Sequence, residues 1–83
     1  MRLLYFAWVR EAIGSRDEEV APPPSVTNVS ALIDWLAGRS EGHARAFADR
    51  ARLRAATDGT FVPLDAPLDG VREVAIFPPV TGG

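Results

Sequence analysis

The residues best suited to chemistry stand at the end of the sequence, where the chain closes on Gly82 and Gly83. Glycine has no Cβ atom, so two in succession can lie extended in a groove that is too narrow for other residues. The terminal carboxylate of Gly83 is ionised at neutral pH, as carboxylates normally are. Because a carboxylate is a poor electrophile, it needs activation by another protein. The pattern predicts a tail that reacts inside a partner's active site.

Six residues form this predicted tail: Pro78, Pro79, Val80, Thr81, Gly82 and Gly83. Two consecutive prolines restrict φ and favour a stiff polyproline conformation, which would direct the tail away from a folded body. Fully extended, six residues span about 20 Å. We therefore expect a folded domain over residues 1–77 and an extended tail over residues 78–83. A frayed chain end without function is the alternative interpretation.

Elsewhere the sequence holds few groups suited to catalysis. It has no cysteine, and all nine basic residues are arginines. This composition excludes a thiolate nucleophile, a disulfide, a sulfur-rich metal site, a lysine Schiff base and a lysine acceptor for another modifier. The single histidine, His43, is expected at the surface, and Asp17, Glu18 and Glu19 are expected to form a solvated strand edge rather than a metal cluster. No Ser-His-Asp set, phosphate loop or metal-binding spacing is present.

The composition is that of one small globular domain. The chain has 83 residues, of which 47% are hydrophobic, and this suits a single core rather than a disordered tail. A net charge of −2 and scattered arginines provide no basic stripe, which argues against nucleic acid as a partner. The sequence contains no apolar run of membrane-spanning length and no signal peptide, so we expect a cytoplasmic protein without membrane association.

Hydrophobic periodicity predicts strands at the beginning of the chain and a helix after them. In residues 2–9 both the odd and the even positions are largely apolar, so both faces of the strand would be apolar. This is typical of a central strand. A helical turn is expected after this strand, ended by Gly14, and a short edge strand is expected over residues 17–21. An N-cap at Thr27 then opens the main helix, and Gly38 closes it. The apolar stripe of this helix consists of Val29, Leu32, Ile33 and Leu36, with Trp35 beside it.

The second half of the chain predicts a short helix and three strands. The helix covers residues 43–51 and would bury Ala44, Phe47, Ala48 and Ala51. Strands over residues 53–57 and 61–64 are joined through Asp58-Gly59, a strong hairpin signal. After a loop, the last strand covers residues 72–77, with Val74 and Ile76 on one face and Ala75 and Phe77 on the other.

This order of elements predicts an α+β fold of the ubiquitin-like β-grasp type, in which a mixed sheet packs on one principal helix. The first and last strands would be central neighbours, which accounts for their apolar character. One sheet face covers the helix, so the other face is open to water or to a partner. Phe6, Phe61 and Phe77 are expected together on that open face, as a docking surface. Incidental exposure of single phenylalanines is the alternative.

The end of the sequence, residues 72–83 (Arg-Glu-Val-Ala-Ile-Phe-Pro-Pro-Val-Thr-Gly-Gly), resembles that of the molybdopterin synthase small subunits, a family of sulfur carriers. Residues 4–11 with Gly14, and residues 66–70 before the last strand, resemble the same family. Length and element order agree, so the resemblance covers nearly the whole chain. Gly-Gly alone is common to many ubiquitin-like proteins, whereas Phe-Pro-Pro-Val-Thr-Gly-Gly is far more specific. The sequence departs from the family in two predicted turns.

The resemblance implies that a separate activating enzyme, using ATP and magnesium, adenylates Gly83, and that a sulfur donor then converts it to a thiocarboxylate. The sulfur would pass, inside the synthase large subunit, to cyclic pyranopterin monophosphate and form the dithiolene of molybdopterin. The chain would be a non-catalytic subunit of a heterotetramer and would bind no cofactor itself. Gly82 would keep the approach to Gly83 free of side chains. Residues expected to contact partners are Phe6, Phe61, Phe77, Pro78, Pro79, Val80 and Thr81.

Three other functions stay open at this point. The chain could carry sulfur for another product, such as the thiazole of thiamin or a thiolated tRNA. It could be a ubiquitin-like modifier that is joined to lysines of target proteins, or a binding module whose tail is idle. A modifier leaves isopeptide-linked products, whereas a sulfur carrier does not, so the products distinguish these classes.

Overall fold

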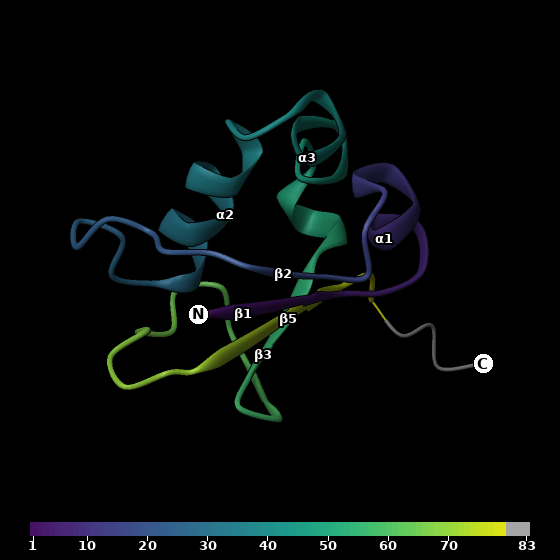
Figure 1. Cartoon of the computed structure of the whole chain (residues 1–83). Helices are drawn as coiled ribbons and strands as arrows, with labels where there is room; N and C mark the ends of the chain where they lie inside the picture. Colours follow the sequence, from purple (N-terminus) through teal and green to yellow (C-terminus); the bar gives the residue numbers. More distant parts are fainter. Residues whose placement is uncertain (80–83) are drawn as a thin grey trace.

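A mixed β-sheet forms one layer of the molecule, and short helices form the other (Figure 1). The computed structural model describes residues 1–79, so the predicted tail residues Val80, Thr81, Gly82 and Gly83 lie outside the described residues. The strands are β1 (Arg2–Tyr5), β2 (Asp17–Glu19), β3 (Arg54–Thr57), β4 (Thr60–Val62) and β5 (Glu73–Phe77). The helices are α1 (Ala7–Ile13), α2 (Val29–Ala37) and α3 (Glu41–Ala46), with a 3₁₀ turn η1 (Arg50–Arg52).

The first and last strands lie side by side at the centre of the sheet, whose order is β2-β1-β5-β3-β4. β1 and β5 are parallel, with Leu3 opposite Val74 and Tyr5 opposite Ile76, and all four side chains are buried against the helices. β2 pairs with β1 and β3 pairs with β5, both antiparallel. This arrangement is the predicted α+β, ubiquitin-like β-grasp fold, and the predicted inward facing of Val74 and Ile76 is confirmed.

The hairpin between β3 and β4 turns at Asp58-Gly59, as the sequence predicted. Both turn residues have positive φ, +48° and +84°, which is the geometry of a two-residue type I′ turn. The Asp58 carboxylate also accepts hydrogen bonds from the backbone N–H groups of Arg72 and Glu73, at 3.2 and 3.0 Å. The turn is therefore tied to the start of β5.

The main helix, α2, buries the predicted stripe completely. Its four inward residues have no measurable exposure, and Trp35 is half-buried at the margin of the core. Gly38 follows its last turn, as expected, but the predicted N-cap is wrong by one residue. Asn28, not Thr27, takes the extended N-cap conformation, and its side-chain oxygen accepts from the N–H of Ala31 at 2.8 Å. The stripe consists of Val29, Leu32, Ile33 and Leu36.

The first strand is shorter than predicted. It ends at Tyr5, because Ala7 takes a φ of +54° and turns the chain out of the sheet into α1. Val9 is still fully buried, but as part of this helix rather than of a strand. Gly14 ends α1 in the left-handed conformation, as the sequence predicted. The edge strand β2 likewise covers residues 17–19 rather than 17–21.

The predicted helix over residues 43–51 is two separate elements, α3 and η1. Each begins at its own N-cap: the Ser40 side chain accepts from the N–H of His43 at the start of α3, and the Asp49 side chain accepts from the N–H of Ala51 at the start of η1. Phe47 is buried as expected. The three alanines of the prediction are exposed, because the buried residues of α3 are His43 and Ala46 and because two of the three follow the end of this helix; they are Ala44, Ala48 and Ala51. No helix within residues 1–79 is long and apolar enough to cross a membrane.

α1 and α3 approach each other most closely at Gly42. A Cβ atom at this position would overlap the carbonyl oxygen of Ala12 and lie 3.3 Å from the Cα of Ile13. Both obstacles are backbone atoms, which cannot rotate away as a side chain can. Glycine is therefore required for this contact between the two helices.

Gly42→Ala should lower the free energy of unfolding by about 1–3 kcal/mol, although alanine favours helices, because the added methyl group overpacks the helix contact. Gly38→Ala is the matched control, since the nearest atom to its Cβ would be the carbonyl oxygen of Trp35 at an ordinary 3.6 Å. Urea unfolding followed by circular dichroism measures both. Equal stabilities of the two variants would contradict the proposed close contact.

Candidate functional site

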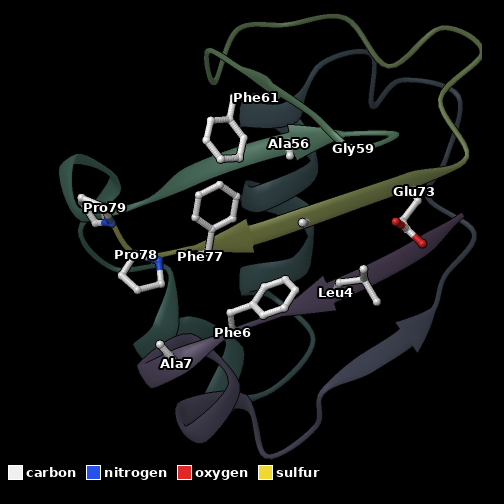
Figure 2. Close-up of a pocket in the computed structure, with 11 residues that line it drawn as sticks. Leu4, Phe6, Ala7, Ala56, Gly59, Phe61, Glu73, Phe77, Pro78 and Pro79 are labelled. Carbon is white, nitrogen blue, oxygen red and sulfur yellow. The ribbon is translucent and has the colours of Figure 1, made fainter. Parts of the chain in front are cut away.

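Three phenylalanines gather on the sheet face opposite the helices, and we call Phe6, Phe61 and Phe77 the aromatic patch (Figure 2). The ring centres of Phe6 and Phe77 are 6.5 Å apart, with the rings nearly perpendicular, and those of Phe61 and Phe77 are 5.5 Å apart. Phe77 lies between the other two, and each contact joins residues that are far apart in the chain. The predicted gathering of the three residues is confirmed.

Strand alternation places the patch on this face. Leu4 lies opposite Ala75, Ala75 opposite Ala56, and Ala56 opposite Phe61, so one outward row crosses four strands. The two alanines at the centre of the row are small. They leave an apolar hollow of about 610 Å³ between the phenylalanines. Among the described residues that line it, Glu73 alone is charged.

The aromatic patch is open to solvent to a degree that is unusual for phenylalanine. Phe61 is 76% exposed and Phe6 is 46% exposed, while Phe77 is half-buried between them. Apolar exposure of this kind, gathered around one hollow, is typical of a surface that another protein covers. The role of these residues in partner binding stays a prediction, because the structure contains a single chain.

The predicted tail leaves the sheet at the margin of the hollow. Pro78 and Pro79 follow directly on β5, and both line the hollow together with Ala7 (Figure 2). A protein that covers the aromatic patch would therefore also meet the base of the tail. The four remaining predicted contact and reaction residues lie outside the described residues: Val80, Thr81, Gly82 and Gly83.

A second group of polar residues lies inside the molecule, where the sequence analysis did not expect one. His43 is 6% exposed, so its predicted surface position is wrong. Glu18 is half-buried, and one carboxylate oxygen accepts hydrogen bonds from the Tyr5 hydroxyl and from Nε2 of His43, both at 2.7 Å. The Ser40 hydroxyl lies 2.6 Å from Nδ1 of His43. A proton on Nε2 leaves Nδ1 free to accept from Ser40, so one neutral tautomer satisfies the whole chain of bonds.

Register explains why Glu18 is not solvated like its neighbours. It lies opposite Leu3, which faces the core, so its side chain shares the inward face, whereas Asp17 lies opposite the outward Leu4. The sequence prediction placed this strand at an edge without setting its register with β1, and the register is what places Glu18 on the inward face. Within residues 1–79 no group of three or more acidic or histidine side chains could hold a metal ion.

The protonation of this group is set by its environment. Burial, followed by the hydrogen bond to Glu18 and its charge, raises the pKa of Tyr5 far above its ordinary value of 10.0. Burial would by itself raise the pKa of Glu18, but the hydrogen bonds from His43 and Tyr5, the charge of His43 when its ring is protonated and the charge of Arg39 outweigh it and hold this pKa below 4.5. Tyr5 therefore stays protonated and Glu18 ionised, which suits a structural cluster between sheet and helices.

The fold and the aromatic patch define a ubiquitin-like protein whose open sheet face carries exposed aromatic side chains. The chain belongs to the ThiS family, whose model matches residues 3–83. It is 43% identical over 83 residues to the molybdopterin synthase sulfur carrier subunit of Escherichia coli (strain K12), a match that covers 100% of this chain and 99% of the relative.

A second relative and a solved structure are also similar to this chain over nearly its whole length. The molybdopterin synthase sulfur carrier subunit of Haemophilus influenzae is 31% identical over 83 residues, covering 100% of this chain and 99% of the relative. The crystal structure of small archaeal modifier protein 1 from H. volcanii matches with a TM-score of 0.70 and 25% identity. That match covers 96% of this chain and 97% of the solved chain.

The polar cluster predicts how stability depends on pH. The folded state lowers the pKa of Glu18, so its stabilising contribution is present above the unfolded value near 4.5 and is lost as the pH falls below it. The folded state raises the pKa of Tyr5, so stability should also fall as the pH rises through 10 and the unfolded chain ionises. Thermal unfolding between pH 3 and pH 11 measures both limits.

Two variants separate these limits. Glu18→Gln should lower the free energy of unfolding by about 1–3 kcal/mol at neutral pH, since it removes a charged hydrogen-bond acceptor. It should also reduce the loss of stability at acid pH. Tyr5→Phe should remove the alkaline limit and should reduce the acid limit only in part, because Glu18 keeps its hydrogen bond with His43. If both variants kept the parent's pH profile, the cluster would have no part in it.

Proposed function

We propose that this chain is the sulfur-carrier subunit of a molybdopterin synthase. The observation that carries the proposal is the match to the Escherichia coli sulfur carrier subunit, at 43% identity over the full length of both chains. The family model also extends through residue 83, so the similarity includes the predicted tail as well as the folded domain. The position of Pro78 and Pro79 beside an exposed aromatic patch supports a tail that is presented to a docked partner.

In this proposal Gly83 is the carboxyl-terminal residue of the working protein and the point at which sulfur is carried. An activating enzyme would join its carboxylate to the α-phosphate of ATP, with magnesium, and release pyrophosphate. A donor that supplies sulfur at the oxidation level of sulfide would then displace AMP and leave a thiocarboxylate. Because the sequence contains no cysteine, the sulfur cannot come from a side chain of this protein.

Delivery of the sulfur would take place in the large subunit. The thiocarboxylate would attack cyclic pyranopterin monophosphate there, and two rounds of transfer would build the dithiolene of molybdopterin. The large subunit would supply the catalytic groups. Gly82 and Gly83 would enter its active site, and the aromatic patch would bind outside it and so reduce the freedom of the tail before reaction.

A protein modifier is the second candidate, and one observation favours it. The chain shares its fold, over nearly its whole length, with small archaeal modifier protein 1. Both functions begin with adenylation of the terminal glycine, so activation does not distinguish them. Their products do, because a modifier ends in an isopeptide bond to a lysine of another protein.

Removal of Gly83 should abolish sulfur transfer and leave the folded domain unchanged. The deletion moves the terminal carboxylate back to Gly82, one residue short of the position at which it would react, whereas the core described above consists of residues within 1–79. The assay mixes the protein with large subunit, activating enzyme, ATP, a sulfur source and cyclic pyranopterin monophosphate, and measures dithiolene formation. Full activity of the truncated chain would contradict the carrier function. A large shift of its unfolding midpoint would show instead that the tail is structural.

Charge substitution should separate docking from folding. Phe61→Asp places a carboxylate on a 76% exposed position and should weaken binding to the large subunit by about 2 kcal/mol, or thirtyfold, with little loss of stability. Phe77→Asp should weaken binding at least as much, with a moderate loss of stability. Ile76→Asp buries a charge at a position with no exposure and should unfold the domain.

Thermal unfolding and isothermal calorimetry on the three variants measure these effects, and Phe61→Leu is the control that keeps the surface apolar. Binding of Phe61→Asp and Phe77→Asp at the parent's affinity would exclude the aromatic patch as the docking surface. If Ile76→Asp unfolded at the parent's temperature, the inward position of Ile76 on β5 would be contradicted.

A further inference from the structure

A second cavity opens beside the aromatic patch and differs from it in chemistry. It has a volume of about 340 Å³ and adjoins the apolar hollow, because Leu4 and Phe6 line both. The remaining residues that line it are Arg2, Tyr5, Arg10, Arg16 and Asp17. Three arginines against one carboxylate make this the basic side of the docking face, on a protein whose net charge is −2.

The three arginines are not equivalent. Arg2 is engaged within the molecule, since its guanidinium lies 2.9 Å from the carboxylate of Asp17 and 3.8 Å from that of Glu73. No carboxylate of the part of the chain that the structure describes lies within ion-pair distance of Arg10 or Arg16. Both are exposed. The guanidinium groups of Arg10 and Arg16 are therefore available for an ion pair with a ligand in this cavity, as far as the described residues are concerned.

The backbone holds these two arginines in place. The carbonyl of Arg10 accepts the hydrogen bond of Gly14 that closes α1, at 2.8 Å. The carbonyl of Arg16 accepts from the N–H of Tyr5 at 2.9 Å, which extends the pairing of β2 with β1 beyond the strands themselves. The two side chains thus come from fixed points on α1 and on the approach to β2, so little backbone ordering would oppose binding of a ligand.

We infer that this cavity binds the carboxylate of an aspartate or glutamate side chain on the synthase large subunit. The inference rests on the proposed function, which supplies the partner. A guanidinium group donates two parallel hydrogen bonds that match a carboxylate, and such pairs strengthen where a protein surface excludes water. Phe6 lines both cavities, so a protein seated on the aromatic patch also covers this one. We call this second cavity the arginine cavity. The apolar hollow supplies contact area, and the arginine cavity fixes the orientation of the bound partner.

Arginine substitution tests the inference by surface plasmon resonance, with the wild-type large subunit immobilised. Arg10→Gln and Arg16→Gln should each weaken binding about tenfold, chiefly through faster dissociation, and Arg16→Lys should recover only part of the loss because it lacks the planar fork. Arg45→Gln is the matched control, since it removes the same charge from an exposed position of α3, on the helical side of the molecule. All variants should unfold at the parent's temperature.

The outcomes separate this inference from the function on which it rests. If wild-type chain binds and both glutamine variants bind as tightly as Arg45→Gln, the arginine cavity is overturned and the proposed function stands. The inference is also overturned if the glutamine variants differ from the parent only in slower association and this difference disappears at high salt. Such a result indicates long-range electrostatic steering rather than a bound carboxylate. If the wild-type chain fails to bind the large subunit, both the inference and the proposed function are overturned.

Discussion

The parallel pairing of β1 with β5 is the constraint on which the rest of the structure depends. It joins the two ends of the chain at the centre of the sheet, with Leu3 beside Val74 and Leu4 beside Ala75. Its inward residues meet the helices and its outward residues form the floor of the apolar hollow. Phe6 follows β1 and Phe77 closes β5, so the pairing also brings these rings together. Because these contacts are distant in sequence, the aromatic patch exists only in the folded protein.

The polar cluster of Tyr5, Glu18 and His43 supports this centre from one side. β2 is only three residues long, and its pairing with β1 alone would hold it weakly. The hydrogen bonds that Glu18 accepts from Tyr5 and His43 fasten β2 to the central strand and to α3 at once. The backbone bond between Tyr5 and Arg16 belongs to the same region. The cluster therefore also positions one wall of the arginine cavity.

Much of the fold could be predicted from local patterns. The stripe of α2, the turn at Asp58-Gly59 and the alternation along β5 each follow from chemistry within a few residues, and each was predicted correctly. The gathering of the aromatic patch followed in turn, because it needs only the facing of β5 and the central position of β1.

Errors arose where a local pattern suits two structures and where the outcome depends on residues far away. The apolar run after Tyr5 suits a strand or a helix, and the positive φ of Ala7 decides between them. His43 lies in a polar stretch, and only the register of β2 shows that Glu18 faces it from a position 25 residues earlier. The arginine cavity has no signal at all in the sequence, since Arg10 and Arg16 meet through the turn between α1 and β2.

The central claim is that this chain carries sulfur as a thiocarboxylate on Gly83, and the mass of the intact protein tests it most directly. The protein would be purified from its own cells after deletion of the large subunit, so that carried sulfur cannot be discharged, and compared with protein from cells that lack the activating enzyme. We predict a mass higher by the difference between one sulfur and one oxygen atom, located at the terminal residue, in the first sample only. Identical unmodified masses in both samples, or recovery of the chain in isopeptide linkage to other proteins, would contradict the account.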